Sequence, residues 1–335
     1  MKIIVSAGGT GGHIYPALAI INKFKEKEPD LDVLYIGTHN RLDIKNFFCI
    51  LKATKKCERI MKEFKPDLVL GIGGYVTYPV ITAAHKLGIK TFIHEQNSHP
   101  GKSNLILQKK VDLIGVSFKE SASSFTKAQD KVFYSGNPCG ENALSLDPMS
   151  KSSLGFKEDK KLVVVVAGSL GSATINEKMK SFLHNVKEND YQVLYITGKD
   201  HYDNFIKDET FKENIKVVPF LDNLPALLKN TDLIVTRAGA STISEILSLN
   251  LPAIFIPSPY VANNHQYYNA IEIKNNGGGE VIEEKELTPE ILSSKINEVL
   301  NDKEKYQNMK ENLKKMAMNN SSDLIYEKLK DLIKW

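Results

Sequence analysis

Four glycines and a histidine stand close together near the start of the sequence, in the segment AGGTGGHIYPALAI. One or two glycines would suffice for a tight turn, whereas Gly8, Gly9, Gly11 and Gly12 followed by His13 predict a binding site. Where Cβ atoms are absent, backbone N–H groups approach an anionic or strongly polar ligand closely. The spacing matches neither the dinucleotide fingerprint G-x-G-x-x-G nor the P-loop G-x-x-x-x-G-K-[ST], which disfavours the two commonest phosphate-binding loops.

The residues on either side place these glycines between a strand and a helix. The run from Ile3 to Val5 is apolar and β-branched, which is typical of a buried strand. From Pro16 onward, apolar residues recur at helical spacing, namely at Ala17, Leu18, Ile20, Ile21 and Phe24. We therefore expect the positive end of a helix to face the ligand.

Length and composition predict an ordinary two-domain protein. The chain has 335 residues, of which 42% are hydrophobic and 25% are charged. No apolar run approaches the roughly 18 residues that a membrane-spanning helix needs, and no signal peptide precedes the first strand, so we expect a cytoplasmic protein. The cysteines are too few and too scattered for a disulfide framework or a zinc site, and we interpret them as incidental thiols: Cys49, Cys57 and Cys139.

Positive charge is concentrated in the N-terminal half. Residues 1–145 contain 20 Lys and Arg against 13 Asp and Glu, whereas residues 146–335 contain 24 against 27. A basic surface attracts anionic lipid, nucleic acid or phosphorylated substrates. The charge alone does not choose among these partners.

Strand-like and helix-like segments alternate along the sequence. The strand-like segments are DVLYIG, DLVLGIGGY, KTFIHE, DLIGVS, VFYSGNP, KLVVVVAGS, QVLYITG, IKVVPF, DLIVTRAG and PAIFIPSP. This alternation predicts an α/β fold with two doubly wound, parallel-sheet (Rossmann-like) domains. We assign residues 1–145 to the first domain, residues 146–160 to a linker and residues 161–318 to the second domain. Residues 319–335 form an amphipathic helix that we place against the first domain.

The glycine-containing turns follow the predicted strands at their carboxyl ends, where open α/β sheets bind ligands. They lie at Gly8–Gly12, Gly73–Gly74, Gly168–Gly171 and Gly239. Two domains that each carry such an edge can face a shared cleft. That arrangement suits two substrates, with one held by each domain.

Seven motifs in sequence order closely resemble the MurG family of N-acetylglucosaminyltransferases: GGTGGHIYPALAI, GIGGYV, HEQNSHPGKSN, SGNP, AGSLGS, TRAGASTISE and NNHQYYNA. The resemblance covers nearly the whole chain and implies the two-domain GT-B glycosyltransferase fold. It implies inverting transfer of N-acetylglucosamine (GlcNAc) from UDP-GlcNAc to the C4 hydroxyl of the N-acetylmuramic acid of lipid I (undecaprenyl-pyrophosphoryl-MurNAc-pentapeptide). The product is lipid II, for peptidoglycan synthesis. The family needs no metal-binding D-x-D motif, so we expect no metal and no cofactor, and we interpret Asp30–Asp32 as a solvated turn.

For the donor, the resemblance implies a diphosphate held between the third and fourth glycine turns. Glu245 would accept hydrogen bonds from the ribose hydroxyls, the backbone of Leu221 would read uracil, and His265 and Gln266 would contact the sugar. The complete donor set implied is Thr10, Gly11, Gly12, Asn97, Ser169, Gly171, Leu221, Gly239, Ala240, Ser241, Glu245, His265 and Gln266.

For the acceptor, the resemblance implies Gly9, Gly12, Gly74, Tyr75 and Asn97. The attacking hydroxyl must lose its proton, and a base with a pKa near neutrality suits this step, for which histidine is the usual choice. Within this motif we favour His13 as the catalytic base. Glu95 is the competing catalytic residue.

The sequence departs from the family pattern at Leu170, Gly140 and Tyr78, where glutamine, arginine and glycine are usual. It is also shorter than the pattern between YIGTHN and RLDIKNFF, after Asn40. Two alternatives stay open. One is a non-hydrolysing UDP-GlcNAc 2-epimerase, which shares the fold and the donor, and the other is a non-catalytic UDP-sugar-binding relative.

The lysine-rich segment RLDIKNFFCILKATKKCERIMKEF is predicted to be helical from Asp43 to Phe64. Cations beside apolar residues at helical spacing are typical of a helix that lies in a membrane interface. In the alternative interpretation Phe47, Leu51 and Met61 pack on the sheet. We expect a protein peripheral to the inner face of the cell membrane, bound to anionic lipid and not to nucleic acid, through Ile44, Lys45, Phe48, Lys52, Lys55 and Lys56.

Overall fold

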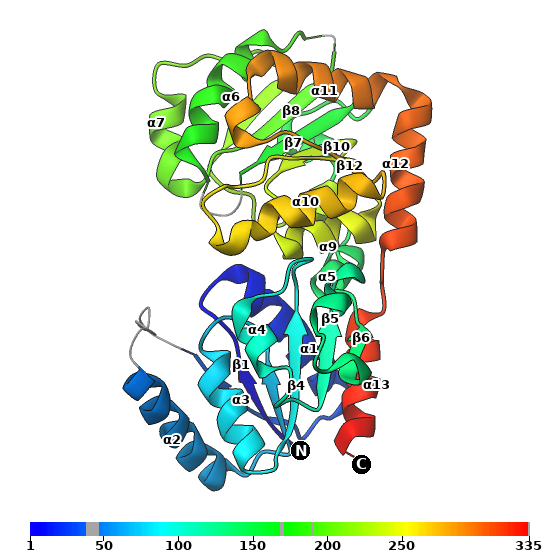
Figure 1. The fold of residues 1–335 in the computed structure, drawn as a ribbon. Helices are drawn as coiled ribbons and strands as arrows, with labels where there is room; N and C mark the ends of the chain where they lie inside the picture. The colour runs from blue at the N-terminus through cyan, green and yellow to red at the C-terminus, as the bar shows by residue number, and fades with distance from the viewer. Residues whose placement is uncertain (38–46, 168–170, 189, 334–335) are drawn as a thin grey trace. The chain divides into compact units, whose positions relative to one another are not determined.

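Buried strands alternate with helices throughout the residues that the computed structural model describes, which are 1–37, 47–167, 171–188 and 190–333. These residues form two units, one of Met1–Glu141 with Met318–Trp335 and one of Asn142–Ala317. Each unit contains a six-stranded sheet in which every paired strand is parallel. This arrangement confirms the predicted α/β fold with two doubly wound sheets (Figure 1).

The sheet of the first unit has the strand order β2-β1-β3-β4-β5-β6. Its strands are β1 (Lys2–Ser6), β2 (Asp32–Ile36), β3 (Leu68–Gly71), β4 (Lys90–Glu95), β5 (Leu113–Val116) and β6 (Val132–Tyr134). The helices are α1 (Gly11–Lys27), α2 (Phe47–Phe64), α3 (Thr77–Lys86), α4 (Lys102–Leu107), α5 (Cys139–Ser145), in which the unit boundary falls, and α13 (Ser321–Ile333). Two short 3₁₀ turns are η1 (Glu120–Ser124) and η2 (Gln129–Lys131).

Successive side chains along each strand point to opposite faces of this sheet, so each face has its own hydrophobic core. On one face Ile4, Val69 and Ile93 pack with buried residues of α2, α3 and α4. On the other face Ile3 and Leu68 pack with α1 and α13. Because both faces are covered, the central strands are almost continuously apolar, as parallel sheets require.

The C-terminal helix α13 packs against α1. The Tyr326 ring meets the Phe24 ring edge-on at 5.0 Å, and the Tyr326 hydroxyl donates to Glu28 Oε1 at 2.8 Å. Lys330 also forms an ion pair with Glu28, and Lys23 pairs with Asp323 at 3.2 Å. These contacts join the last helix of the chain to the first unit.

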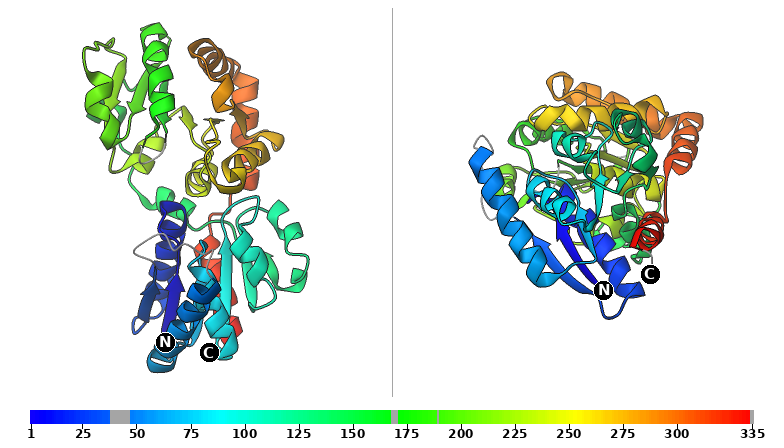
Figure 2. Two further views of the ribbon diagram at one scale, coloured as in Figure 1. Left: turned by 60° about the vertical axis from the view of Figure 1, so that its left-hand side comes forward. Right: turned by 60° about the horizontal axis from the view of Figure 1, so that its bottom comes forward.

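The sheet of the second unit has the order β12-β11-β10-β7-β8-β9. Its strands are β7 (Leu162–Val166), β8 (Gln192–Ile196), β9 (Ile215–Val218), β10 (Leu233–Thr236), β11 (Ala253–Phe255) and β12 (Gly279–Val281). The turned views in Figure 2 show helices on either side of each sheet. In the second unit the helices are η3 (Lys151–Leu154), α6 (Ala173–Asn185), η4 (Lys199–His201), α7 (Tyr202–Ile206), α8 (Leu224–Leu228), α9 (Ala240–Leu249), η5 (Ala262–Asn264), α10 (His265–Asn275), η6 (Glu284–Glu286), α11 (Pro289–Asn301) and α12 (Lys303–Met316).

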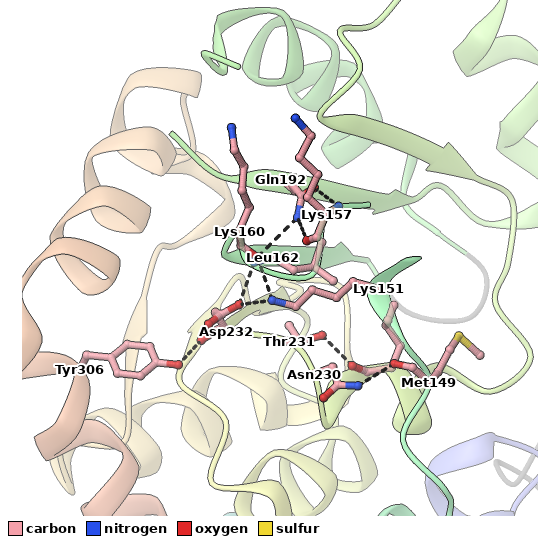
Figure 3. A network of polar contacts seen from close by, with 11 residues as sticks. Met149, Lys151, Lys157, Lys160, Leu162, Gln192, Asn230, Thr231, Asp232 and Tyr306 are labelled. Carbon is pink, nitrogen blue, oxygen red and sulfur yellow. Dashed lines mark hydrogen bonds and ion pairs between the residues drawn. The ribbon is translucent and has the colours of Figure 1, made fainter. Parts of the chain in front are cut away.

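The segment that we predicted as a linker lies against the second unit. Lys151 Nζ is 3.1 Å from Asp232 Oδ2, and the same carboxylate oxygen accepts a hydrogen bond from the Leu162 N–H (Figure 3). Met149 accepts a hydrogen bond from the Asn230 amide at 2.9 Å. This network holds the segment at the amino end of β10.

One helix boundary differs from the predicted one, and one helix was not predicted. The first helix begins at Gly11 instead of Pro16, so the proline lies inside α1. Its missing N–H removes only one bond, and the apolar face of Ala17, Ile20 and Phe24 still packs on the sheet. Helix α4 was not predicted, because its six residues are too few to show helical periodicity.

Candidate active site

The imidazole of His13 lies against the backbone of two glycine turns. The turns follow the adjacent strands β1 and β3, and the Gly8 N–H donates to the Gly73 carbonyl at 2.9 Å. A Cβ at Gly8 would lie 2.9 Å from His13 Nδ1, and one at Gly73 would lie 2.6 Å from Cδ2. Gly73 also has a φ of +100°. Glycine at these two positions therefore makes room for the histidine ring.

Gly9 and Gly12 have a different role, because a Cβ at either position would meet no atom within 4 Å. Both are exposed, and Thr10 at the N-cap of α1 places its hydroxyl 3.1 Å from His13 Nδ1 and not on a backbone N–H. The space next to Gly9 and Gly12 at the start of this helix is therefore open. A polar ligand could approach the backbone N–H groups there. Gly11, also exposed, lies beside the Tyr15 ring.

The second turn brings Gly74 and Tyr75 next to the first. A Cβ at Gly74 would lie 2.8 Å from Gly8 Cα, and its φ is +80°. Thr77 at the start of α3 donates its hydroxyl hydrogen to the Gly73 carbonyl at 2.9 Å, which fixes the turn. Tyr75 is half-buried beside it.

Glu95 is buried at the end of β4 and accepts hydrogen bonds at both carboxylate oxygens. Oε1 accepts from the Asn97 backbone N–H at 3.0 Å and from its side-chain amide at 3.2 Å. Oε2 accepts from the Gly101 N–H at 2.9 Å and from the Asn104 amide at 2.8 Å. With 2% of its surface exposed, this carboxylate fixes the loop that carries Asn97.

A second histidine near this site, His94, is fully buried. Its Nε2 donates to the Gly136 carbonyl at 2.9 Å, and its Nδ1 lies 3.0 Å from Gln96 Nε2. Burial lowers the pKa of His94 to about 4, so this ring is neutral at physiological pH. The arrangement indicates a structural histidine.

In the second unit, α9 starts directly after β10 with the predicted residues Gly239, Ala240 and Ser241. The Ser241 hydroxyl is buried and has no hydrogen-bond partner among the described residues. An unpaired buried hydroxyl at a helix N-terminus is suited to an anion.

Glu245 lies one turn further along α9, half-buried, with no hydrogen bond or ion pair to any residue that the structure describes. Desolvation by burial raises the pKa of this carboxyl from 4.5 to about 7. A carboxyl group held in such surroundings is a candidate for ligand binding.

The other glycine turn of this unit precedes α6. Ser169 and Leu170 lie outside the described residues, whereas Gly171 has a φ of +72° and packs against the Thr197 backbone. A Cβ there would lie 2.1 Å from the Thr197 carbonyl oxygen, so only glycine fits.

The predicted sugar-binding residues His265 and Gln266 open α10. Asn263 and Asn264, just before them, both have positive φ angles, of 55° and 50°. The Ser258 N–H donates to Gln266 Oε1 at 2.9 Å, which leaves the amide nitrogen of Gln266 to donate to a ligand. The His265 Nδ1 lies 2.9 Å from the Ala262 carbonyl. Leu221 is half-buried and follows β9.

Helix α2 has one buried and one exposed face. Thr54, Cys57 and Met61 are buried, whereas Phe48 is 78% and Leu51 41% exposed. The predicted packing of Leu51 on the sheet is therefore wrong, because the i+3 and i+7 positions after Thr54 form the buried face. Lys52, Lys55 and Lys56 are exposed. Ile44 and Lys45 lie outside the described residues.

The structure shows the contacts around two of the three departures from the family pattern, Tyr78 and Gly140. The Lys110 ammonium lies 4.9 Å from the centre of the Tyr78 ring, which packs against the hydrophobic core of the first unit. Gly140 lies in the first turn of α5, next to Glu141, whose carboxylate accepts hydrogen bonds from the Ser322 N–H and hydroxyl. Leu170 is outside the described residues.

Neither a metal-binding cluster nor a membrane-spanning helix occurs in the described part of the chain. Its His, Cys, Asp and Glu side chains form no group of three or more that could hold a metal ion. No helix there combines the length and apolar character needed to cross a bilayer.

Arg237 and Glu284 lie at the same end of the second sheet and were not among the site residues predicted from the sequence. Their side chains lie 2.6 Å apart beside the start of α6, although 47 positions separate them in the chain. Arg237 belongs to the TRAGASTISE motif, which was a usable signal. Nothing local marks Glu284 among the acidic residues around it.

Both halves of the chain match known proteins. Residues 162–325 match the glycosyltransferase family 28 C-terminal domain, and residues 3–46 and 42–116 match the N-terminal domain of that family. A Bacillus licheniformis protein named UDP-N-acetylglucosamine–N-acetylmuramyl-(pentapeptide) pyrophosphoryl-undecaprenol N-acetylglucosamine transferase is 40% identical over 99% of both chains.

Solved structures share the fold. The crystal structure of MurG from Acinetobacter baumannii has a TM-score of 0.77, with 24% identity over 99% of this chain and 100% of that one. A putative UDP-N-acetylglucosamine 2-epimerase from Listeria monocytogenes has a TM-score of 0.74, with 14% identity over 98% of this chain and 95% of that one. The likeness to both shows the fold, which is the predicted GT-B architecture.

The same comparisons locate the predicted shortening after Asn40. The alignment with the Bacillus licheniformis protein runs over 363 positions, more than the 335 residues of this chain. The N-terminal domain match is in two pieces that meet at residues 42–46. A segment present in the relatives is therefore missing here. Since a full-length relative shares 40% of its residues and both domains match, this chain belongs to glycosyltransferase family 28 and, within it, to the MurG family of N-acetylglucosaminyltransferases.

Proposed function

We propose that this protein transfers N-acetylglucosamine from UDP-GlcNAc to the C4 hydroxyl of the N-acetylmuramic acid of lipid I, giving lipid II and UDP. The observation that carries the proposal is the 40% identity, over 99% of both chains, to a relative named for this transfer. The glycine turns at the carboxyl ends of both sheets support it, because substrates of open α/β sheets bind there.

His13 is the base in this proposal. The acceptor oxygen attacks the anomeric carbon, the bond from that carbon to the UDP oxygen breaks, and the hydroxyl proton moves to the imidazole. In the tautomer that donates from Nδ1 to Thr10 Oγ1, the Nε2 lone pair accepts this proton. The four hydrogen bonds that Glu95 accepts make it less suited to the role and favour a function in holding Asn97.

The leaving diphosphate carries negative charge that the site must stabilise. The N–H groups at the starts of α6 and α9, with the unpartnered Ser241 hydroxyl, supply hydrogen-bond donors and the positive ends of two helices. Glu245 accepts from the ribose hydroxyls, and the Gln266 amide donates to the sugar. This scheme uses no metal and no cofactor.

The lipid acceptor requires the enzyme to work at a membrane surface, on the cytoplasmic side. The exposed Phe48 and Leu51 beside the cations of α2 support adsorption of that helix to anionic lipid. The basic excess of residues 1–145 is assigned to this surface and to the acceptor diphosphate, not to nucleic acid.

The test is UDP release from UDP-GlcNAc with and without lipid I. We expect release only when lipid I is present. Formation of UDP-N-acetylmannosamine without acceptor would instead identify an epimerase, whose fold this chain shares. Binding of UDP without turnover under either condition would identify a non-catalytic relative.

A further inference from the structure

A buried guanidinium joins the carboxyl ends of two strands to the start of a helix in the second unit. Arg237 directly follows β10 and is 8% exposed. Its Nη1 donates to the Ile256 carbonyl after β11 at 3.0 Å, and its Nη2 donates to the hydroxyl of Ser172, the N-cap of α6, at 3.0 Å. One side chain thus spans the edge of the sheet at which the donor turns lie.

Glu284 in η6 supports this arrangement from the outside. Its Oε2 lies 2.6 Å from Arg237 Nη2, and its Oε1 accepts a hydrogen bond from the Thr174 hydroxyl at 2.8 Å. Its backbone carbonyl accepts from Lys178 Nζ at 2.9 Å. Residues 174 and 178 lie one turn apart on α6, so Glu284 contacts the first turns of that helix at two points.

The two charges compensate each other in a place that water hardly reaches. The side chains of Arg237 and Glu284 are 10% and 9% exposed. Removing the carboxylate would leave the guanidinium buried without a counter-ion.

We propose that Glu284 is a positioning residue for donor binding: through Arg237 and Thr174 it holds the start of α6 in register with the start of α9. The inference rests on the proposed function, since both helix starts are assigned there to the donor diphosphate. Arg237 donates to protein atoms at both terminal nitrogens, so it acts on the diphosphate through the turns.

The experiment compares Glu284→Gln with Asp232→Asn. Glutamine keeps an oxygen for Thr174 but turns an amide towards the guanidinium. Asp232 is the matched control, because its carboxylate pairs with the buried Lys151 (Figure 3). Asp232 precedes β10, whereas Arg237, the partner of Glu284, follows it. Each variant loses an ion pair that is at least partly buried. Of the two residues, only Glu284 lies at the edge of the sheet that carries the predicted donor-binding turns.

We expect Glu284→Gln to raise the KM for UDP-GlcNAc roughly 10- to 100-fold, the effect of a small displacement of binding groups, with kcat nearly unchanged. Glu284→Asp should restore part of the affinity. Asp232→Asn should lower the melting temperature while leaving this KM at the wild-type value. Calorimetry with UDP, which needs no acceptor, should show the same order of affinities.

A wild-type KM in Glu284→Gln, or an equal rise in both variants, would overturn the inference. If Glu284→Gln does not fold, Thr174→Val removes a single hydroxyl and is expected to raise the KM several-fold; no rise would count against the inference. Wild-type protein that binds UDP but does not use lipid I contradicts the proposed function alone, because the UDP affinities of the variants still test the positioning role.

Discussion

Two carboxylates that the sequence assigned to the site lie in opposite surroundings. Glu95 is bonded at both oxygens by four donors, whereas Glu245 has no partner among the described residues and a pKa raised to about 7 by burial. A carboxylate that is already saturated holds structure in place. One left unpaired at a ligand-binding edge is available for a ligand.

Replacing Glu245 tests the donor site. Glu245→Ala should weaken UDP binding by about 1.5–3 kcal/mol, the contribution of a hydrogen bond to a charged group. Isothermal titration calorimetry measures it directly. The same affinity in variant and wild type would remove Glu245 from the donor site.

The pH dependence of the unliganded protein gives a second test at this residue. The folded pKa of Glu245 is about 7, against 4.5 as the ordinary value. Between these values the folded state binds the proton more tightly, so this group's stabilising contribution is complete below pH 4.5 and is lost as the pH rises through 7. We expect Glu245→Gln to flatten the fall in the free energy of unfolding between pH 5 and 8, measured by urea titration. An unchanged slope would show that Glu245 does not titrate in this range.

His13 and Glu95 can be separated as candidate bases. His13→Gln should lower kcat by roughly 10²–10⁴ and leave UDP affinity intact, because Leu221 and Glu245, predicted to contact uracil and ribose, belong to the other unit. Glu95→Gln should instead loosen the loop at Asn97 and raise the KM for lipid I. A near-normal kcat in His13→Gln, with a collapsed kcat in Glu95→Gln, would reverse the assignment.

Residue types and spacing singled out His13 as a site candidate, whereas Glu245 and Gln266 were predicted from the resemblance of their motifs to the MurG family. Neither source pointed to Glu284, whose proposed role depends on a partner 47 positions away. Nor did either predict the four hydrogen bonds that Glu95 accepts. Such contacts depend on which strand ends the topology brings together.

Helices and strands were predictable wherever an apolar period was long enough. The strand KTFIHE matches β4, Lys90–Glu95, and the lysine-rich helix matches α2 to its last residue, Phe64. The start of α1 at Gly11 was missed, because glycine has a poor helix propensity and Pro16 resembled a helix start. Tertiary packing of the helix on the sheet prevails over both signals.

Helix α2 is the element on which the membrane proposal depends. Near an anionic membrane each Lys or Arg contributes about 1 kcal/mol, so changing Lys45, Lys52, Lys55 and Lys56 to glutamine should release the protein from anionic vesicles in a sedimentation assay. Turnover of a short-chain, water-soluble acceptor should persist.

The matched control removes four exposed lysines from the second unit, Lys187, Lys207, Lys303 and Lys314. It changes the net charge equally and should leave vesicle binding intact. Equal release by both variants would point to a general charge effect, and no release by the α2 variant would show that the helix is not the anchor.

At the scale of the whole chain, two sheets of the same parallel type carry two sets of glycine turns at their carboxyl edges. The residues predicted for the acceptor lie on the first unit, and most of those predicted for the donor, among them Ser241, Glu245 and Gln266, lie on the second. The exceptions are Thr10, Gly11, Gly12 and Asn97, which are predicted donor residues of the first unit. This division follows from the repeated strand and helix alternation. The sequence could therefore predict two substrates, but not the missing segment's effect on the first unit.

A reaction supported by helix starts and hydrogen-bond donors should not depend on divalent cations. Adding EDTA in excess is expected to leave kcat unchanged, in an assay that follows UDP release. Loss of activity that magnesium restores would show that a metal ion takes part.

The most direct measurement of the central claim is the fate of the sugar itself. Purified protein is incubated with lipid I and UDP-GlcNAc labelled in the sugar, and the lipid fraction is extracted and analysed by mass spectrometry. We predict that label moves into the lipid, which gains the mass of one N-acetylglucosamine residue. Label that stays in the aqueous phase, with lipid I unchanged, would contradict it.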